Sequence, residues 1–150
     1  MSRNIKIATI LPYKENYTVS KAQAAAIWVA DFYKYSRFKE NNFIFGHTKD
    51  KDYLSKNYIN INISNLKSKF SSSTKEYCKN IIKKSKKMNF DIIEIHNRPK
   101  VFEYLSPKLK SKYILSCSSG TAAIHLALMA INLKRNDVFS DRLLLFLLHF

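Results

Sequence analysis

Residues 5–11, Ile-Lys-Ile-Ala-Thr-Ile-Leu, decide the fold class of this chain, and Pro12 ends the stretch. The stretch is rich in β-branched residues and almost continuously apolar, which is typical of a strand buried on both faces of a parallel sheet. The run at 58–63 alternates apolar residues with asparagine, as a half-exposed strand does. Together with the other runs of strand length, these stretches predict five strands, beginning near Ile5, Phe43, Ile59, Asp91 and Tyr113.

Helical patterns separate the predicted strands. Residues 20–23 (Ser-Lys-Ala-Gln) and 73–76 (Ser-Thr-Lys-Glu) have the spacing of capping boxes, and apolar residues recur on one helical face after each. We expect helices at about 20–36 and 73–88, a short helix at 98–105 and a last helix at 121–131. Because strands and helices alternate within 150 residues, the sequence predicts a single Rossmann-like α/β domain with three layers and a mainly parallel sheet.

The chain is strongly basic, with 26 lysine and arginine residues against 11 acidic residues and a formal charge of +15. Such a surface favours polyanions such as nucleic acid or an anionic membrane. Most of the basic residues are lysines, whereas surfaces that read bases prefer arginine, so nucleic acid is a disfavoured partner. The lysine-rich face of the helix at 73–88 leaves peripheral contact with an anionic membrane open, beside the simpler interpretation of a solvated surface.

Glycine and cysteine usage excludes several classes of function. Only 2 glycines occur, so the chain has no glycine-rich loop of the kind that binds nucleotide phosphates. Cys78 and Cys117 have no metal-ligand or redox-motif spacing, and the N-terminal apolar stretch is too short for a signal peptide. We therefore expect no metal site and a reducing, cytoplasmic compartment. The apolar tail at 138–150 is too short to span a bilayer.

Two polar segments follow predicted strands, at the place where open parallel sheets bind their ligands. The first leads from Pro12 into a helix whose N–H groups would suit an anion or a sugar hydroxyl. The second combines an imidazole suited to a general base with an amide and a guanidinium suited to a phosphate or carboxylate. Ordinary turn-forming roles stay open for both. The candidate residues are Lys14, Glu15 and Asn16 in the first segment and His96, Asn97 and Arg98 in the second.

A third candidate segment follows the last predicted strand. Small hydroxyl residues lead into Gly120 and an alanine-rich helix is expected to begin at once, so free backbone N–H groups and a threonine hydroxyl would point at an anion. The alternative is a tight turn that only packs the helix against the sheet. The residues of this predicted phosphate cup are Ser119, Gly120, Thr121 and Ala122.

Residues 4–105 resemble the N-terminal domain of bacterial two-domain glycosyltransferases of the B-type fold, which act in surface-polysaccharide assembly. The matching stretches are Lys-Ile-Ala-Thr-Ile-Leu-Pro-Tyr-Lys-Glu-Asn-Tyr at 6–17, the helix start at 21–26 with the run 28–32, and Asp-Ile-Ile-Glu-Ile-His-Asn-Arg-Pro at 91–99. The resemblance implies a nucleotide-sugar donor, a glycan or lipid-linked acceptor and no required cofactor. It also implies that His96 is catalytic and that the substrate-binding residues are Lys14, Glu15, Asn16, Asn97 and Arg98.

Residues 112–137 resemble instead the cofactor-phosphate turn of DegT-like sugar aminotransferases, through Ser-Cys-Ser-Ser-Gly-Thr-Ala-Ala-Ile-His at 116–125. In that family the Ser-Gly-Thr turn binds the phosphate of pyridoxal phosphate, so this alternative implies cofactor binding at the predicted phosphate cup. The two resemblances divide the chain into a glycosyltransferase-like acceptor domain at 1–110, an aminotransferase-like fragment at 111–137 and an apolar tail at 138–150.

The expected function is that of a truncated glycosyltransferase, because the longer resemblance covers only the acceptor domain of that family. We expect the isolated chain to be catalytically silent, since the family holds the donor in a second domain across the cleft. Two alternatives stay open. One is a fragment of a pyridoxal-phosphate-dependent sugar aminotransferase, and the other is a non-catalytic basic module whose binding to polyanions would depend on salt and not on sugars.

Overall fold

The computed structural model describes residues 5–63, 72–96 and 98–117. Each of the five strands in these residues begins within two residues of its predicted position. The predicted helix at 121–131 lies outside the described residues. In chain order the elements are β1 (Ile7–Ile10), α1 (Ala24–Tyr35), β2 (Asn42–Gly46), β3 (Tyr58–Asn60), α3 (Ser73–Ser85), β4 (Phe90–His96), α4 (Pro99–Leu105) and β5 (Ser111–Cys117).

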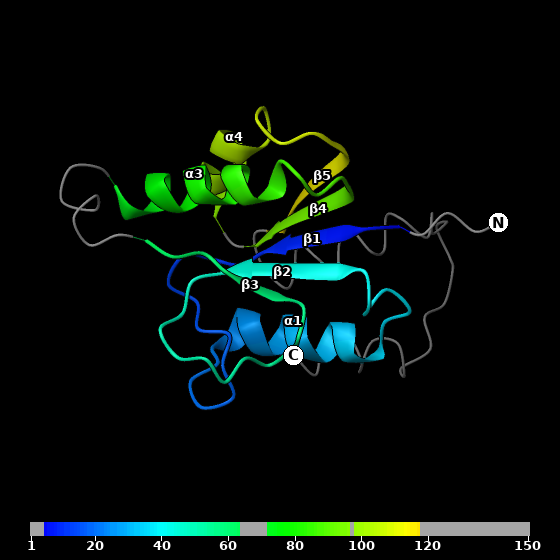
Figure 1. Ribbon diagram of the computed structural model, residues 1–150, viewed down its shortest axis with the longest axis vertical. Helices are drawn as coiled ribbons and strands as arrows, with labels where there is room; N and C mark the ends of the chain where they lie inside the picture. Colours follow the sequence, from blue (N-terminus) through cyan, green and yellow to red (C-terminus); the bar gives the residue numbers. More distant parts are fainter. Residues whose placement is uncertain (1–4, 64–71, 97, 118–150) are drawn as a thin grey trace, which may run out of the picture.

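The five strands run parallel in one sheet, in the order β3-β2-β1-β4-β5. Helix α1 covers one face, and α3 and α4 cover the other, so the described residues form three layers (Figure 1). The predicted fold class, a small Rossmann-like α/β domain, is therefore confirmed. The segment that begins at residue 111 enters this same sheet as β5, which pairs with β4 from Phe90 opposite Ser111 to His96 opposite Cys117.

Each face of the sheet buries its own apolar core. In β1, Ala8 and Ile10 belong to the core under α3 and α4, whereas Ile7 belongs to the core under α1. Successive strand residues face opposite sides and both sides are covered, so the strand needs apolar residues at nearly every position. The apolar face predicted from helical periodicity consists of Ala22, Ala26, Val29 and Tyr33, and the last three are the buried residues of α1. Ala22 precedes the helix and is only partly buried.

Both predicted capping boxes are wrong. Helix α1 begins at Ala24 rather than near Ser20, the N-cap of α3 precedes the predicted box by one residue, and neither N-cap side chain makes a capping hydrogen bond. The backbone N–H of Ser20 donates instead to Asp52 Oδ2, 3.0 Å away. The N-terminus of α1 is capped from a distant part of the loop, because Glu15 Oε1 accepts from the N–H of Ala26 at 3.0 Å.

The close approach of Gly46 to Tyr58 gives a first prediction. A β-carbon at Gly46 would lie 2.7 Å from the hydroxyl oxygen of Tyr58 and 2.9 Å from its Cε2. The Tyr58 ring cannot move easily, because it stacks on Tyr17 at 4.9 Å and contacts Tyr53 at 4.7 Å. We expect Gly46→Ala to lower the free energy of unfolding by about 1–3 kcal/mol, measured by urea denaturation.

The double variant Gly46→Ala/Tyr58→Phe provides the control for this steric explanation. The Tyr58 hydroxyl is buried without a hydrogen-bond partner among the described residues, so its removal should cost little by itself. It should also return part of the stability lost in Gly46→Ala, because the closest contact is with that oxygen. Additive effects of the two substitutions would contradict the steric explanation.

Candidate functional site

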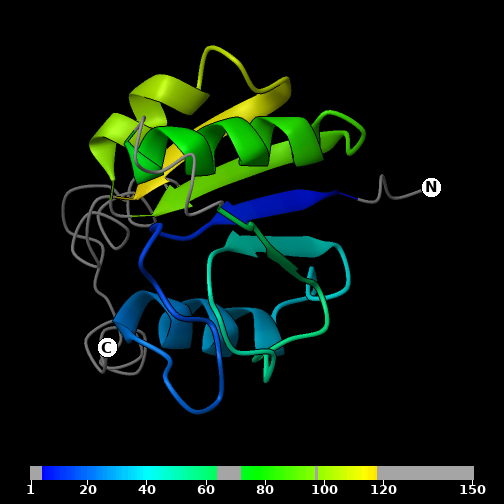
Figure 2. The ribbon, with the colours of Figure 1, turned by 60° about the vertical axis from the view of Figure 1, so that its left-hand side comes forward.

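The carboxyl ends of β1 and β4 lie side by side, because the two strands pair in parallel with Ile10 opposite Ile95. The chain leaves β1 for α1 on one face of the sheet and leaves β4 for α4 on the other face (Figure 2). In open α/β sheets this divergence is the place where a ligand crevice forms. His96 ends β4 and the loop at 13–16 follows β1, so both predicted segments emerge at this edge.

The end of β4 places a histidine beside a carboxylate. His96 and Glu94 are two positions apart on one strand, so both side chains face the α1 side. The Nε2 atom of His96 lies 3.8 Å from Glu94 Oε2. This nitrogen is buried and has no hydrogen-bond partner among the residues that the structure describes. A proton on Nε2 would face the carboxylate, which would leave Nδ1 as the nitrogen with a lone pair.

Hydroxyl groups from two other elements hold Glu94. Its Oε2 accepts from the hydroxyl of Tyr33 at 3.0 Å and lies 3.2 Å from Oγ1 of Thr9. Thr9 Oγ1 also lies 3.0 Å from Asn42 Oδ1, and its one proton can serve only one of the two acceptors at a time. A polar cluster therefore runs across β4, β1 and β2 beneath α1 and fixes the carboxylate beside His96.

Sequence reasoning missed Glu94, because the residue lies in a run that was interpreted only as a strand. A signal was nevertheless present. Thr9 is a polar residue inside an otherwise apolar strand, and Glu94 interrupts the apolar run at 92–95. Glu94 also shares its strand face with the terminal histidine. A half-buried carboxylate two positions before a histidine at a strand end is a reasonable criterion for a positioned general base.

An aromatic pair from α1 borders His96. The ring centroid of Trp28 lies 5.5 Å from that of the imidazole. Phe32, one helical turn further on, stacks on Trp28 at 5.3 Å with an interplanar angle of 7°. Trp28 is half-buried and Phe32 is exposed. Partly exposed aromatic rings offer apolar contact area at low entropic cost, which suits a ring-shaped ligand.

The other predicted residues have different surroundings. Lys14 is exposed, and the carboxylate of Glu15 is occupied in capping α1. Asn16 Oδ1 accepts from the hydroxyl of Thr48 at 3.2 Å, which connects the loop after β1 to the chain after β2. Arg98 is exposed at the N-cap of α4. Of these side chains, Lys14 and Asn16 lie together in a pocket that does not include His96.

This pocket encloses about 300 Å³ between the loops that follow β1 and β2. Sequence analysis missed its second wall, although Gly46-His47-Thr48-Lys49 leaves a strand end as directly as the segments that were singled out. Application of the carboxyl-edge rule to every predicted strand would have found it. The lining includes Tyr13, Lys14, Lys21, His47, Thr48 and Lys49.

The two loops that form the pocket are joined to each other. The Val19 N–H donates to the Asp52 carbonyl at 2.9 Å, and Lys21 Nζ lies 2.9 Å from Asp50 Oδ2. The hydrogen bond and the negative charge of Asp50 raise the pKa of Lys21, and hydrogen bonds from Ser20 lower the pKa of Asp52. Lys21 and Asp52 are therefore both charged at neutral pH, which favours the ion pair of Lys21 with Asp50 and the hydrogen bond from the Ser20 N–H to the Asp52 carboxylate.

Two groups of predicted residues lie outside the described part of the chain, namely Asn97 and the phosphate cup of Ser119, Gly120, Thr121 and Ala122. Within residues 5–63, 72–96 and 98–117, no cluster of three histidine, cysteine or acidic side chains is arranged to hold a metal ion. In the same residues no helix combines the length and the apolar character needed to cross a membrane.

Comparison of the chain with known proteins gave no match, whether with protein-family models, with curated proteins or with solved structures. The glycosyltransferase and aminotransferase resemblances of the sequence therefore stay predictions. The carboxyl edge of the sheet holds both the His96 cluster and the lysine-lined pocket.

Proposed function

We propose that this chain is the acceptor-binding part of a glycosyltransferase, which transfers a sugar from a nucleotide sugar to a surface-polysaccharide or lipid-linked acceptor. The observation that supports this most is the pair formed by His96 and Glu94, 3.8 Å apart, at the end of β4. The carboxyl edge of an open parallel sheet is the expected place for a ligand, and an imidazole held beside a carboxylate suits the removal of a proton from a hydroxyl.

The proposed step assigns one role to each of these residues. The acceptor hydroxyl gives its proton to Nδ1 of His96, while the oxygen bonds to the anomeric carbon of the donor sugar. The bond from that carbon to the nucleoside diphosphate breaks, and the diphosphate leaves with the electron pair. Glu94 stabilises the imidazolium that forms and acts as a positioning residue, since it touches His96 and not the acceptor.

The aromatic pair of Trp28 and Phe32 supports a sugar as the ligand at this edge. Exposed aromatic faces pack against the apolar face of a ring and leave its hydroxyl groups to polar partners. The resemblance assigns the nucleotide sugar to a second Rossmann-like domain, so the residues described here would contribute the acceptor side of the cleft. Binding of the acceptor is therefore the property of this chain that can be tested directly.

Titration with neutral oligosaccharides tests this proposal. Trp28 is the only tryptophan and its ring lies 5.5 Å from His96, so its fluorescence reports on this edge of the sheet. We expect saturable changes at millimolar sugar. His96→Gln should weaken binding about two- to tenfold, because one hydrogen bond to the sugar is lost.

His47→Gln is the matched control, because it makes the same substitution in the separate lysine-lined pocket. A neutral sugar should bind this variant and the unaltered protein equally well. Absence of any saturable Trp28 response across a panel of neutral sugars would contradict the proposed function. Equal weakening in the two histidine variants would also contradict it.

A further inference from the structure

The pocket between the loops after β1 and β2 has an excess of positive charge. Its lining includes Lys14, Lys21 and Lys49, with Asp50 as the acidic residue. Asp50 pairs with Lys21 at 2.9 Å. Lys14 and Lys49 are exposed, and neither forms an ion pair with a residue of the described chain. Two ammonium groups are thus available to a ligand in the pocket.

The wall that carries Lys49 is fixed by hydrogen bonds. The N–H of Thr48 donates to Asn60 Oδ1 at 3.0 Å, and Asn60 Nδ2 donates to the Thr48 carbonyl at 2.9 Å. The Thr48 hydroxyl donates to Asn16 Oδ1 at 3.2 Å, which connects this wall to the loop after β1. Thr48 is 3% exposed. The backbone of the pocket is therefore organised before a ligand arrives, which lowers the entropic cost of binding.

A histidine completes the polar lining. His47 stacks on Tyr13, with ring centroids 5.2 Å apart and an interplanar angle of 27°. Its Nδ1 lies 2.8 Å from the Ile61 carbonyl oxygen. A carbonyl oxygen can only accept, so Nδ1 carries a proton and Nε2 is the nitrogen left for a ligand. The neutral ring can accept from a hydroxyl there, and the protonated ring can donate to an anion.

We propose that this pocket binds a phosphate group, as a monoester or a diphosphate, through Lys14, Lys49 and His47. Lysine ammonium groups are common phosphate ligands, and they act as point charges that need no fixed orientation. Lys21 contributes less than the other lysines, because Asp50 neutralises it. The pocket and the His96 cluster are different places on one edge of the sheet. A phosphate in the pocket therefore leaves His96 free to act on a ligand.

The spacing of the strand ends that carry the two sites suggests which molecule the phosphate belongs to. In the sheet β1 separates β2 from β4, and neighbouring strands lie about 4.8 Å apart, so the strand ends are separated by roughly 10 Å. A sugar ring with its phosphate spans such a distance. Resting on the proposed function, we assign the phosphate to the acceptor, which makes the acceptor a phosphate-linked sugar.

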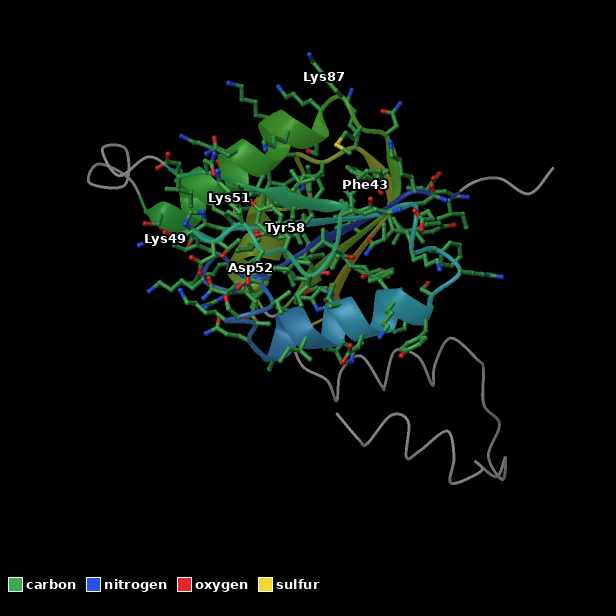
Figure 3. The ribbon with its side chains drawn as sticks, turned by 60° about the horizontal axis from the view of Figure 1, so that its bottom comes forward. Phe43, Lys49, Lys51, Asp52, Tyr58 and Lys87 are labelled. Carbon is green, nitrogen blue, oxygen red and sulfur yellow. The ribbon has the colours of Figure 1, made fainter. Side chains whose placement is uncertain are left out.

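Backbone NMR of the full chain tests the phosphate site. We expect inorganic pyrophosphate to shift the amide signals of Thr48 and Lys49. The variants Lys14→Gln and Lys49→Gln should each weaken its binding about three- to tenfold, a modest effect because both groups are exposed. Lys87→Gln is the matched control, because it removes the same charge at an exposed site far from Lys49 (Figure 3).

Two results would overturn the phosphate site. One is the absence of shifts at Thr48 and Lys49 with millimolar pyrophosphate. The other is equal weakening in Lys49→Gln and Lys87→Gln, which would mean that only the net charge of the chain attracts the anion. Binding of hexose 1-phosphate and of phosphatidylglycerol vesicles then distinguishes a phosphorylated sugar from a lipid headgroup. If Lys14→Gln and Lys49→Gln weaken the binding of hexose 1-phosphate, the ligand is a phosphorylated sugar. If they weaken the binding of the vesicles instead, the ligand is a lipid headgroup.

The His96 measurements separate this inference from the proposed function. Binding of pyrophosphate in His96→Gln should equal that in the unaltered protein, because His96 does not line the pocket. Pyrophosphate binding without any response to neutral sugars would leave the phosphate site standing and remove its assignment to the acceptor. Neutral sugars that bind at His96, with no pyrophosphate binding, would leave the proposed function standing and overturn the phosphate site.

Discussion

Replacement of Phe45 by alanine should lower the free energy of unfolding by about 3–5 kcal/mol. The Phe45 side chain is fully buried in β2 and packs edge-on against Phe90, with ring centroids 5.9 Å apart at 83°. It belongs to the core between the sheet and α3, together with Tyr77 and Ile81. Removal of the ring therefore costs both the burial of its surface and the contacts of the residues around the cavity.

Phe32→Ala is the matched control, because it deletes the same atoms from a side chain that is 46% exposed on α1. We expect this substitution to lower the free energy of unfolding by about 1 kcal/mol or less, mostly because the stack on Trp28 is lost. Urea denaturation followed by circular dichroism measures both variants without relying on tryptophan fluorescence. Similar losses in the two variants would contradict the position of Phe45 in the core.

The strands could be predicted from the sequence because their signal is local. The core on each side of β1 needs an apolar residue at almost every position, so the run at 5–11 has few polar interruptions. Alternation of such runs with helical patterns then favours parallel pairing, because parallel neighbours need a crossover. The order of the strands follows from these rules only in part, and the structure supplies it.

The helix starts could not be predicted in the same way, because long-range contacts determine them. Ser20 has the residue type and spacing of a cap, but its N–H finds an acceptor in Asp52, 32 residues away. Glu15 caps α1 from 11 residues upstream of Ala26. A capping box describes only the neighbours along the chain, so it cannot anticipate that a loop folds back to provide the carboxylate.

The candidate site was partly predictable for a related reason. His96 was found because it directly follows a clear strand signal, and Lys14 because it follows the first one. Glu94 depends on a hydroxyl from α1, and Lys49 depends on the pairing of two loops. Neither environment is visible before the elements are assembled, so sequence reasoning identified single residues and missed the partners that give them chemistry.

Tyr77→Ala should have an even larger effect on stability, with a loss of roughly 4–6 kcal/mol. The ring is fully buried in α3, and its hydroxyl lies 2.9 Å from the Leu11 carbonyl oxygen and 3.3 Å from that of Phe45. Leu11 directly follows β1 and Phe45 is the penultimate residue of β2, so both carbonyls lie just before the two loops of the phosphate pocket. Urea denaturation at neutral pH measures the loss.

Tyr77→Phe measures the contribution of the hydroxyl separately from that of the ring. We expect the free energy of unfolding to fall by about 1–3 kcal/mol, because the Leu11 carbonyl loses the hydrogen bond from Tyr77, whereas the Phe45 carbonyl still accepts from the Leu11 N–H. We also expect a several-fold weaker binding of pyrophosphate, because both loops start from these strands. Tyr35→Phe is the matched control, since Tyr35 is 80% exposed, and it should change neither quantity. Unchanged stability in Tyr77→Phe would contradict the hydrogen bonds assigned to this hydroxyl.

The burial of the Tyr77 hydroxyl predicts how the free energy of unfolding changes at alkaline pH. Burial raises the pKa of Tyr77 well above its ordinary value of 10.0, and burial also raises that of Tyr17. Below about pH 10 both the folded and unfolded chains keep these protons, so the groups add no pH dependence. Above it the unfolded chain releases protons that the folded chain retains, and the free energy of unfolding falls. Tyr77→Phe should lose less stability than the unaltered protein from pH 10 upward, and an equal loss in both would contradict the burial of this hydroxyl.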